Sequence, residues 1–336
     1  MRAVVSRLLE AVPALIGVII ATFLLTRVLP GDPAAYFAGP TATAEAIAQV
    51  KAQMGLDRPL PAQFWRYVKD LRRGDLGQSL TTGQPVTRDL AARLPASAEL
   101  TLFGFVVALG IAVPLGILAA VRQGSFVDHC CRIIMTAGVS LPVFFTGLLL
   151  VYVFYFLLGL APAPLGRLDA FTAAPAGITG FYLLDSLIAG DFSTFRAAAS
   201  QILLPGLTLA IFALAPIARI TRASMLAVLA ADFIRTARAS GLQSQTIIMT
   251  YAFRNAMLPV VTTLGMVFSF LLGANVLVEK VFAWPGIGSY AVEALIASDF
   301  APVQGFVLTM AVLYVLLNLL IDLTYGLIDP RVRMTA

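Results

Sequence analysis

Residues Ser97–Val121 read SAELTLFGFVVALGIAVPLGILAAV, and this stretch decides the fold. Its one charged residue, Glu99, stands near the start, and no charge follows for the rest of the stretch. A helix needs roughly 20 mainly apolar residues to cross the hydrocarbon core of a bilayer. The stretch is long enough, so it predicts a membrane-spanning helix.

The whole chain has the composition of a membrane protein. It is 59% hydrophobic and 12% charged, whereas a soluble domain is about 25% charged. A chain of 336 residues cannot hide that much apolar side chain in one aqueous core. The net charge of +5 comes from basic residues beside apolar stretches and not from one patch, which favours membrane orientation over nucleic-acid binding.

Further apolar stretches predict an all-α polytopic membrane protein with six transmembrane helices. The six are Leu8–Leu29, Ser97–Val121, Ile133–Leu160, Gln201–Ala218, Met257–Val278 and Ala301–Ile321. The first lacks a small-residue cleavage site and is interpreted as an uncleaved span. Within the second, Gly104, Gly110 and Gly116 predict close helix packing. A seventh candidate, Phe171–Leu184, is interrupted by proline and glycine and is not counted.

The distribution of basic residues predicts the orientation. The loop that begins at Arg219 also carries four arginines against a single acid, Asp232: Arg222, Arg235, Arg238 and Arg254. Cytoplasmic loops are enriched in Lys and Arg. Six spans put this loop on the same side as both termini, so both termini are expected in the cytoplasm. A seventh span would place the most basic loop outside.

These assignments divide the chain into three parts. Residues 1–29 form a cytoplasmic tail and the first span, 30–96 form a small outer segment, and 97–336 form the core with its cytoplasmic loop at about 219–256. Within the outer segment, Pro61–Arg73 predicts a short helix with Phe64, Trp65, Val68 and Leu71 on one face.

Metal binding and catalysis are not expected. Cys130 and Cys131 are adjacent, which disfavours a disulfide, and His129 is the only histidine. Nothing matches the phosphate-binding pattern G-x-x-x-x-G-K-[ST], so ATP would have to bind a partner.

The most informative loop is residues 231–259, ADFIRTARASGLQSQTIIMTYAFRNAMLP. Gly241 predicts the end of a first helix in a left-handed turn, and Gln243–Ala256 predicts a second helix, with Pro259 opening the fifth span. From the pattern alone, two interpretations stay open. The loop docks a cytoplasmic partner through small residues and arginines, or it is a basic amphipathic helix on anionic headgroups.

Two motifs in this loop resemble the EAA loop of ABC importer permeases: RTARASG at 235–241 and RNAMLPV at 254–260. Arg235 replaces the usual Glu, and the spacing from Gly to Leu-Pro is longer than in sugar permeases. Both departures are typical of the dipeptide/oligopeptide/nickel branch. LPGDP at 29–33, GLDRPL at 55–60, GDLGQS at 74–79 and EKVFAWPG at 279–286 are similar to that branch too, and the outer segment resembles its first, B-type permease.

The resemblance implies a type I ABC importer permease fold and a multi-pass protein of the bacterial inner membrane. The chain itself would be no enzyme and bind no cofactor, with ATP and Mg on two partner ATPase subunits. Further partners would be a second homologous permease, a periplasmic or lipid-anchored solute-binding protein and membrane lipids, and no nucleic acid. The expected ATPase-coupling residues are Arg235, Thr236, Ala237, Arg238, Ala239, Ser240, Gly241, Arg254, Leu258 and Pro259.

Two further sets of residues are predicted with functional roles. Polar residues at membrane depth are costly unless they face protein or water, so Asn275, Gln304 and Asn318 are expected along the translocation path, with helix–helix hydrogen bonding as the alternative for the two asparagines. Residues expected to dock the binding protein are Trp65, Asp75, Phe282 and Trp284.

The expected function is import of di- or oligopeptides by alternating access coupled to the partner ATPases. Nickel chelates, glutathione or another small solute are alternatives within the same class. A secondary transporter is a more distant alternative, but the two halves of the sequence contain no internal repeat. The sequence specifies neither the solute, nor whether the ATPase chains differ, nor the resting conformation.

Overall fold

The computed structural model describes residues 12–24, 33–39, 41–138, 140–169 and 171–328. Helices dominate these residues, and four of them are long and apolar enough to cross a membrane: Val86–Val121, Phe192–Leu229, Ser244–Val281 and Phe300–Ile321. Shorter apolar helices cover Val12–Leu24, Val143–Leu157 and Ile287–Ile296. The prediction of an all-helical polytopic membrane protein is confirmed.

The described residues fall into two compact units. Unit 1 lies within residues 3–97 and 285–315, and unit 2 lies within 98–284 and 316–336. Two long helices pass from one unit to the other along the chain, α5 (Val86–Val121) and α14 (Phe300–Ile328).

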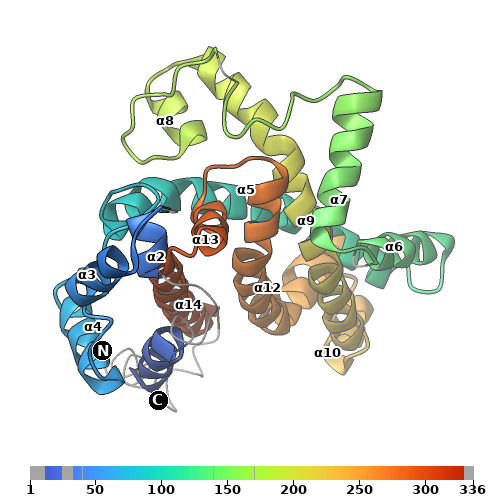
Figure 1. The fold of residues 1–336 in the computed structure, drawn as a ribbon. Helices are drawn as coiled ribbons and strands as arrows, with labels where there is room; N and C mark the ends of the chain where they lie inside the picture. The colour runs from blue at the N-terminus through green and yellow to red at the C-terminus, as the bar shows by residue number, and fades with distance from the viewer. Residues whose placement is uncertain (1–11, 25–32, 40, 139, 170, 329–336) are drawn as a thin grey trace. The chain divides into compact units, whose positions relative to one another are not determined.

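Unit 1 contains the helix Val12–Leu24, α2 (Pro33–Ala38), α3 (Ala44–Met54), α4 (Leu60–Leu71) and α13 (Ile287–Ile296), with residues 86–97 of α5 and 300–315 of α14 (Figure 1). Its core joins segments about 200 residues apart, because Val86 and Leu90 of α5 pack against Ile287 and Tyr290 of α13. The Tyr290 hydroxyl donates to Asp89 at 2.8 Å. The residues of the predicted outer segment therefore share a core with 285–315.

A second polar contact holds the same unit together. The buried carboxylate of Asp299, just before α14, accepts hydrogen bonds from the Ser79 hydroxyl at 2.8 Å and the Thr81 N–H at 3.0 Å. Hydrogen bonds to a carboxylate are stronger than neutral ones. They join the turn before α5 to the start of α14.

Unit 2 is built around α9 (Phe192–Leu229), which packs against α6, α7, α8 and α12 (Figure 1). These partners are α6 (Phe126–Ala137), α7 (Val143–Leu150), α8 (Tyr182–Ile188) and α12 (Arg254–Val281). Glycines allow close approach. A Cβ on Gly104 would lie 2.8 Å from that of Leu209, and one on Gly116 only 2.7 Å from the Ala218 carbonyl.

The prediction of close helix packing in the second span is confirmed at two of its three glycines, and the third has no neighbour within the described chain. Gly104 and Gly116 meet α9 closely, whereas a Cβ on Gly110 would meet nothing within 4 Å. Gly110 is exposed, on the side of α5 that lacks a neighbour within the described chain.

The third predicted span, Ile133–Leu160, is not one helix. The helix α6 ends at Ala137, and α7 begins only at Val143 and continues as a π-helical stretch over Val151–Leu157. Pro142 lies between them in an extended conformation at φ −57° and ψ 142°. A proline has no N–H to donate within a helix, and its ring obstructs the preceding turn. The break therefore follows from Pro142.

The range Phe171–Leu184 contains no spanning helix. The seven-residue α8 begins at Tyr182, and the described residues of 171–181 form turns and extended chain. The predicted outer helix Pro61–Arg73 is present as α4, but Trp65 does not share its packed face.

Candidate functional site

The loop singled out in the sequence contains the helix α10 (Asp232–Ala239). Ile234 and Ala237, three residues apart, are buried in a core with Met225 of α9 and Ala256 of α12. Ala120 at the end of α5 and Ile247 and Ala252 of the next helical stretch complete this core. The apolar face of α10 is therefore packed on the rest of unit 2.

The opposite face of α10 is exposed. The exposed residues are Asp232, Phe233, Arg235, Thr236, Arg238 and Ala239, with Ser240 directly after the helix. Arg235 pairs with Asp232 at 3.2 Å, and the two side chains are 75% and 93% exposed. A surface pair of this kind contributes little to stability. Arg235 can therefore leave Asp232 and pair with another acidic residue at a low cost in free energy.

Gly241 ends α10 as the sequence predicts. Its φ of +75° is in the left-handed region, its N–H donates to the Arg238 carbonyl at 3.0 Å, and the Leu242 N–H donates to that of Ala237 at 3.3 Å. A Cβ added at Gly241 would meet nothing within 4 Å. Glycine is needed here for its backbone conformation, because a side chain would have space but would be strained.

The chain after this turn differs from the prediction. Helical structure runs without a break from Ser244 to Val281, with a π-helical stretch over Ile247–Phe253, so Pro259 lies inside a helix and does not open one. Neighbouring groups can satisfy the backbone that a proline frees in a membrane helix. Arg254, Leu258 and Pro259 are exposed on this helix.

A partly buried ion pair lies in the same unit, close in sequence to the core beneath α10, with Asp128 2% and Arg222 22% exposed. Arg222 donates from Nε and Nη2 to the two carboxylate oxygens of Asp128, both at 2.8 Å. The Gly124 N–H adds a third hydrogen bond at 3.1 Å. The Arg222 guanidinium in particular lowers the pKa of Asp128 from 3.8 to about 2, against the opposing effect of burial. The pair joins α6 to α9 one turn before Met225.

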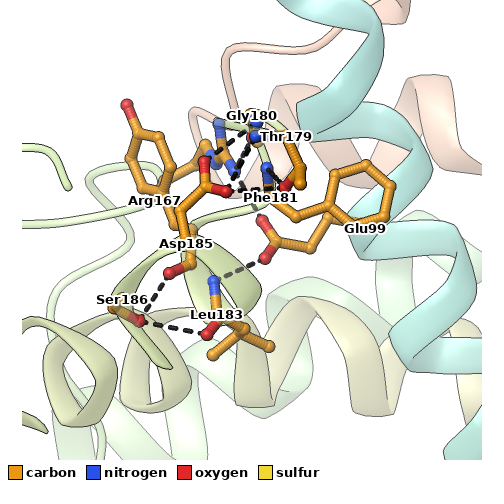
Figure 2. A network of polar contacts seen from close by, with 9 residues as sticks. Glu99, Arg167, Thr179, Gly180, Phe181, Leu183, Asp185 and Ser186 are labelled. Carbon is orange, nitrogen blue, oxygen red and sulfur yellow. Dashed lines mark hydrogen bonds and ion pairs between the residues drawn. The ribbon is translucent and has the colours of Figure 1, made fainter. Parts of the chain in front are cut away.

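A second buried network holds the segment 158–191, between the π-helical stretch and α9, against α5 (Figure 2). Glu99 of α5 accepts hydrogen bonds from Arg167 Nη2 at 2.6 Å and from the Leu183 N–H at 2.7 Å. The same Arg167 nitrogen donates to the Gly180 carbonyl at 2.7 Å, and its guanidinium lies 3.4 Å from the centre of the Tyr182 ring.

Asp185 organises the turn that presents these groups. Figure 2 shows its carboxylate facing Thr179 and Gly180, whose backbone N–H groups donate to it at 2.8 and 2.9 Å. Burial would raise the pKa of Asp185, but the hydrogen bonds from Thr179 and Gly180 lower it below its usual value. Two parts of this segment, Arg167 and residues 179–186, are therefore held in place by three buried charged groups.

The residues predicted along the translocation path lie in different places. Asn275 is buried in α12 and donates to Glu279 at 3.0 Å. Gln304 is buried in α14 within unit 1, and Asn318 is half-buried further along the same helix. Their role in the path stays a prediction.

The residues predicted to dock a binding protein divide into two pairs. Trp65 and Asp75 are exposed, and Asp75 accepts a hydrogen bond from the Gly77 N–H at 2.8 Å. Phe282 and Trp284 are 3% and 2% exposed. The Phe282 carbonyl accepts the N–H of Gly166 at 3.1 Å. Phe282 and Trp284 thus pack inside the chain in this conformation.

Sequence reasoning did not find the two buried ion pairs. Asp128 and Arg222 are 94 residues apart, and Glu99 and Arg167 are 68 apart. The one available signal was that each is a charged residue close to an apolar span, where an unpaired charge is costly. Within the described residues, no group of three or more His, Cys, Asp and Glu could hold a metal ion.

Comparisons with known proteins identify the family. Residues 112–334 match the family model described as binding-protein-dependent transport system inner membrane component, and residues 1–101 match the model of its N-terminal region. The chain belongs to this family. It is a membrane-spanning permease component of a binding-protein-dependent transport system, and such a system includes a solute-binding protein and an ATPase as partners.

Several relatives align along nearly the whole chain. The probable D,D-dipeptide transport system permease protein DdpB of Escherichia coli is 45% identical over 94% of this chain and 93% of its own. The dipeptide transport system permease proteins DppB of Alkalihalophilus pseudofirmus and Escherichia coli are 40% and 39% identical, over 97% and 98% of this chain and 98% of their own. The predicted resemblance to peptide-branch permeases is confirmed.

Proposed function

We propose that this permease imports di- or oligopeptides. The full-length similarity to dipeptide permeases supports this substrate class. Nickel chelates, glutathione or another small solute are the alternatives within the same transporter class. In a binding-protein-dependent system, part of the selection of solute falls to the binding protein.

We further propose that the exposed face of α10 is the surface through which the partner ATPase acts. The observation that carries this proposal is the division of α10 into two faces. Ile234 and Ala237 are buried in the core of unit 2, whereas Arg235, Thr236 and Arg238 are exposed. A force applied to the exposed face would pass through the packed face into α9 and α12. The remaining residues of the proposed coupling surface are Ala239, Ser240, Gly241, Arg254, Leu258 and Pro259. Ala237, which the sequence grouped with them, lies on the packed face and would pass the force on to the core.

ATP would act by shifting the population of two conformations of the transporter. A decisive shift, from 1:99 to 99:1, needs a preference of about 5.5 kcal/mol for one state. ATP and Mg would bind two ATPase subunits, and a second homologous permease would complete the pore. This chain would hydrolyse nothing and would transmit the change through α10.

The orientation follows from the same assignment. Arg219, Arg222, Arg235 and Arg238 lie in or beside the α10 loop, and basic loops face the cytoplasm. Both termini would share that side, in the bacterial inner membrane. The outer segment would then receive the binding protein, with Asp75 as an exposed candidate, and Asn275, Gln304 and Asn318 would line the path.

The experiment is ATP-driven uptake of a labelled dipeptide into proteoliposomes that contain the complete complex and its binding protein. Gly241→Val is compared with Gly190→Val, because Gly190 also has a positive φ, +68°, and open space around its Cβ position. Both variants incur the same left-handed strain of roughly 1–2 kcal/mol.

The proposal expects Gly241→Val to lose peptide uptake per ATP hydrolysed and Gly190→Val to retain it. Equal uptake by the two variants would contradict the coupling role of the α10 loop. Excess unlabelled dipeptide should compete for uptake in the wild-type complex, whereas competition by a nickel chelate or glutathione alone would contradict the substrate class.

A further inference from the structure

The helix α4 carries a flank that the transport mechanism does not use. The flank consists of Trp65, Val68, Lys69, Arg72 and Arg73, which line a hollow of about 290 Å³. Lys69, Arg72 and Arg73 are exposed, and Trp65 is 70% exposed. An indole beside three cations is an unusual surface to leave open to water.

The neighbouring face of the same helix fixes its depth relative to the membrane. Phe64 and Tyr67 pack on Phe23, with ring centroids 5.2 and 5.9 Å apart. Phe23 is 3% exposed and lies in the last described turn of the apolar helix Val12–Leu24. The α4 helix therefore packs on the last described turn of this apolar helix, a few residues before the apolar stretch gives way to Arg27 and Pro30-Gly31-Asp32 in the sequence.

The helix Val12–Leu24 has a lipid-facing side. Every fourth residue along it is an exposed aliphatic side chain, namely Val12, Ile16, Ile20 and Leu24. The stripe reaches the last described turn, and Arg27 and Asp32 follow closely in the sequence, so this turn lies near the edge of the hydrocarbon. A helix packed on this turn lies at headgroup depth, where Trp is enriched and Lys and Arg extend to the polar region.

We propose that the α4 flank binds the headgroup of an anionic phospholipid. Phosphate suits guanidinium groups, which donate several hydrogen bonds from one plane, and the indole of Trp65 suits the boundary between glycerol and water. The sequence predicted that Trp65 docks a solute-binding protein. The packing of α4 on Phe23 favours lipid, because it holds the flank beside the bilayer.

The arrangement of charge along α4 agrees with this occupant. Lys69 and Arg72 follow Trp65 by four and seven residues, so they share its side of the helix. Asp70 lies on another side, since successive residues are rotated by about 100°. Trp65, Lys69 and Arg72 thus share one side without an acid, and Asp70 borders only the Arg73 edge of the flank.

The test uses the full-length chain in nanodiscs and the fluorescence of Trp65. The chain has two tryptophans, and the other, Trp284, is buried, so the difference between wild type and Trp65→Phe isolates the signal of Trp65. The discs contain phosphatidylcholine with or without about 30 mol% phosphatidylglycerol, which creates the anionic surface. Brominated phosphatidylglycerol or brominated phosphatidylcholine serves as the quencher.

The expected result is stronger quenching of Trp65 by brominated phosphatidylglycerol than by brominated phosphatidylcholine. The preference should fall about tenfold in Arg72→Gln/Arg73→Gln, since each basic group near an anionic surface contributes up to about fivefold. The preference for phosphatidylglycerol should also weaken as the salt concentration rises from about 0.05 to about 0.5 M. The matched control is Arg58→Gln/Arg88→Gln, which removes two exposed arginines of the same unit outside the flank and should leave the preference unchanged.

Two outcomes would overturn the proposal. Equal quenching by the two lipids, or the same loss in the control variant, would show that the flank does not select an anionic headgroup. A change in Trp65 fluorescence on addition of the solute-binding protein, in discs without anionic lipid and dependent on Arg72 and Arg73, would assign the flank to that protein.

Discussion

Arg222 donates two hydrogen bonds of 2.8 Å to the carboxylate of Asp128, which is 2% exposed. This pair joins α6 to α9 one turn before Met225, the α9 residue that packs under α10. It therefore fixes the position of the helix against which the proposed coupling surface rests.

Replacing Asp128 with alanine should destabilise the chain by about 2 kcal/mol, because the Arg222 guanidinium and the Gly124 N–H lose a charged acceptor. Thermal unfolding in detergent measures the effect. The exposed pair of Asp232 and Arg235 provides the control, and Arg235→Gln should change stability by less than about 0.5 kcal/mol. Equal effects of the two substitutions would contradict the role of the buried pair.

The same carboxylate predicts how stability depends on pH. Its pKa is lowered from 3.8 to about 2 in the folded chain, so the stabilisation is complete above about pH 4 and is lost as the pH falls toward 2. The stability difference between wild type and Asp128→Ala should therefore stay constant from pH 5 to pH 8. A difference that shrinks as the pH falls from 8 to 5 would show that the group titrates higher.

The glycines of α5 should respond differently to one methyl group. Gly116→Ala should destabilise the chain by about 1–2 kcal/mol, because the new Cβ would meet the backbone of α9. Gly110→Ala should be neutral or stabilising by up to about 1 kcal/mol, since alanine favours helix and the space is open. Unfolding of both variants in the same detergent tests this, and the opposite order would contradict the packing of α5 on α9.

Glu99 should protect the segment 158–191 from proteolysis. Arg167 is 8% exposed while it is paired with Glu99, so trypsin should not cleave after it in the wild-type chain. Glu99→Ala should release the arginine and allow cleavage there, and Glu99→Gln, which keeps an acceptor for the Leu183 N–H, should give an intermediate rate. Cleavage after Arg167 at the same rate in all three would contradict the contact.

Local sequence features predicted most of the long helices. They did not predict the contacts between segments that are far apart in the sequence. Hydropathy located α5, α9 and α14 because one span carries its whole signal within about 20 residues. Hydropathy joined α6 and α7 into one predicted span, because the break between them depends on the single residue Pro142. Other prolines, such as Pro205 and Pro216, lie inside the unbroken helix α9. Hydropathy does not distinguish a proline that breaks a helix from a proline that lies inside one.

In the candidate site, too, local features were predicted from the sequence and long-range contacts were not. The left-handed turn at Gly241 follows from a local pattern, and the structure contains it. The pairing of Glu99 with Arg167 and the shared core of Val86 with Ile287 depend on how distant segments pack. A single sequence carries no record of such contacts, so the separate outer segment 30–96 was predicted without its partner 285–315.

The proposed function requires that the α10 loop lies in the cytoplasm, as the surface on which an ATPase acts. It is tested by labelling with a membrane-impermeant maleimide in a background where Cys130 and Cys131 are replaced by alanine. Ser240→Cys places one exposed thiol on the loop, and Ala173→Cys places one in the segment 158–191.

The thiol at position 240 should react only after the cells are permeabilised, and it should react more slowly when the partner ATPase is co-assembled. The thiol at position 173 should react in intact cells in both cases. Labelling of position 240 from outside intact cells would contradict the orientation, and labelling unchanged by the ATPase would contradict the coupling surface.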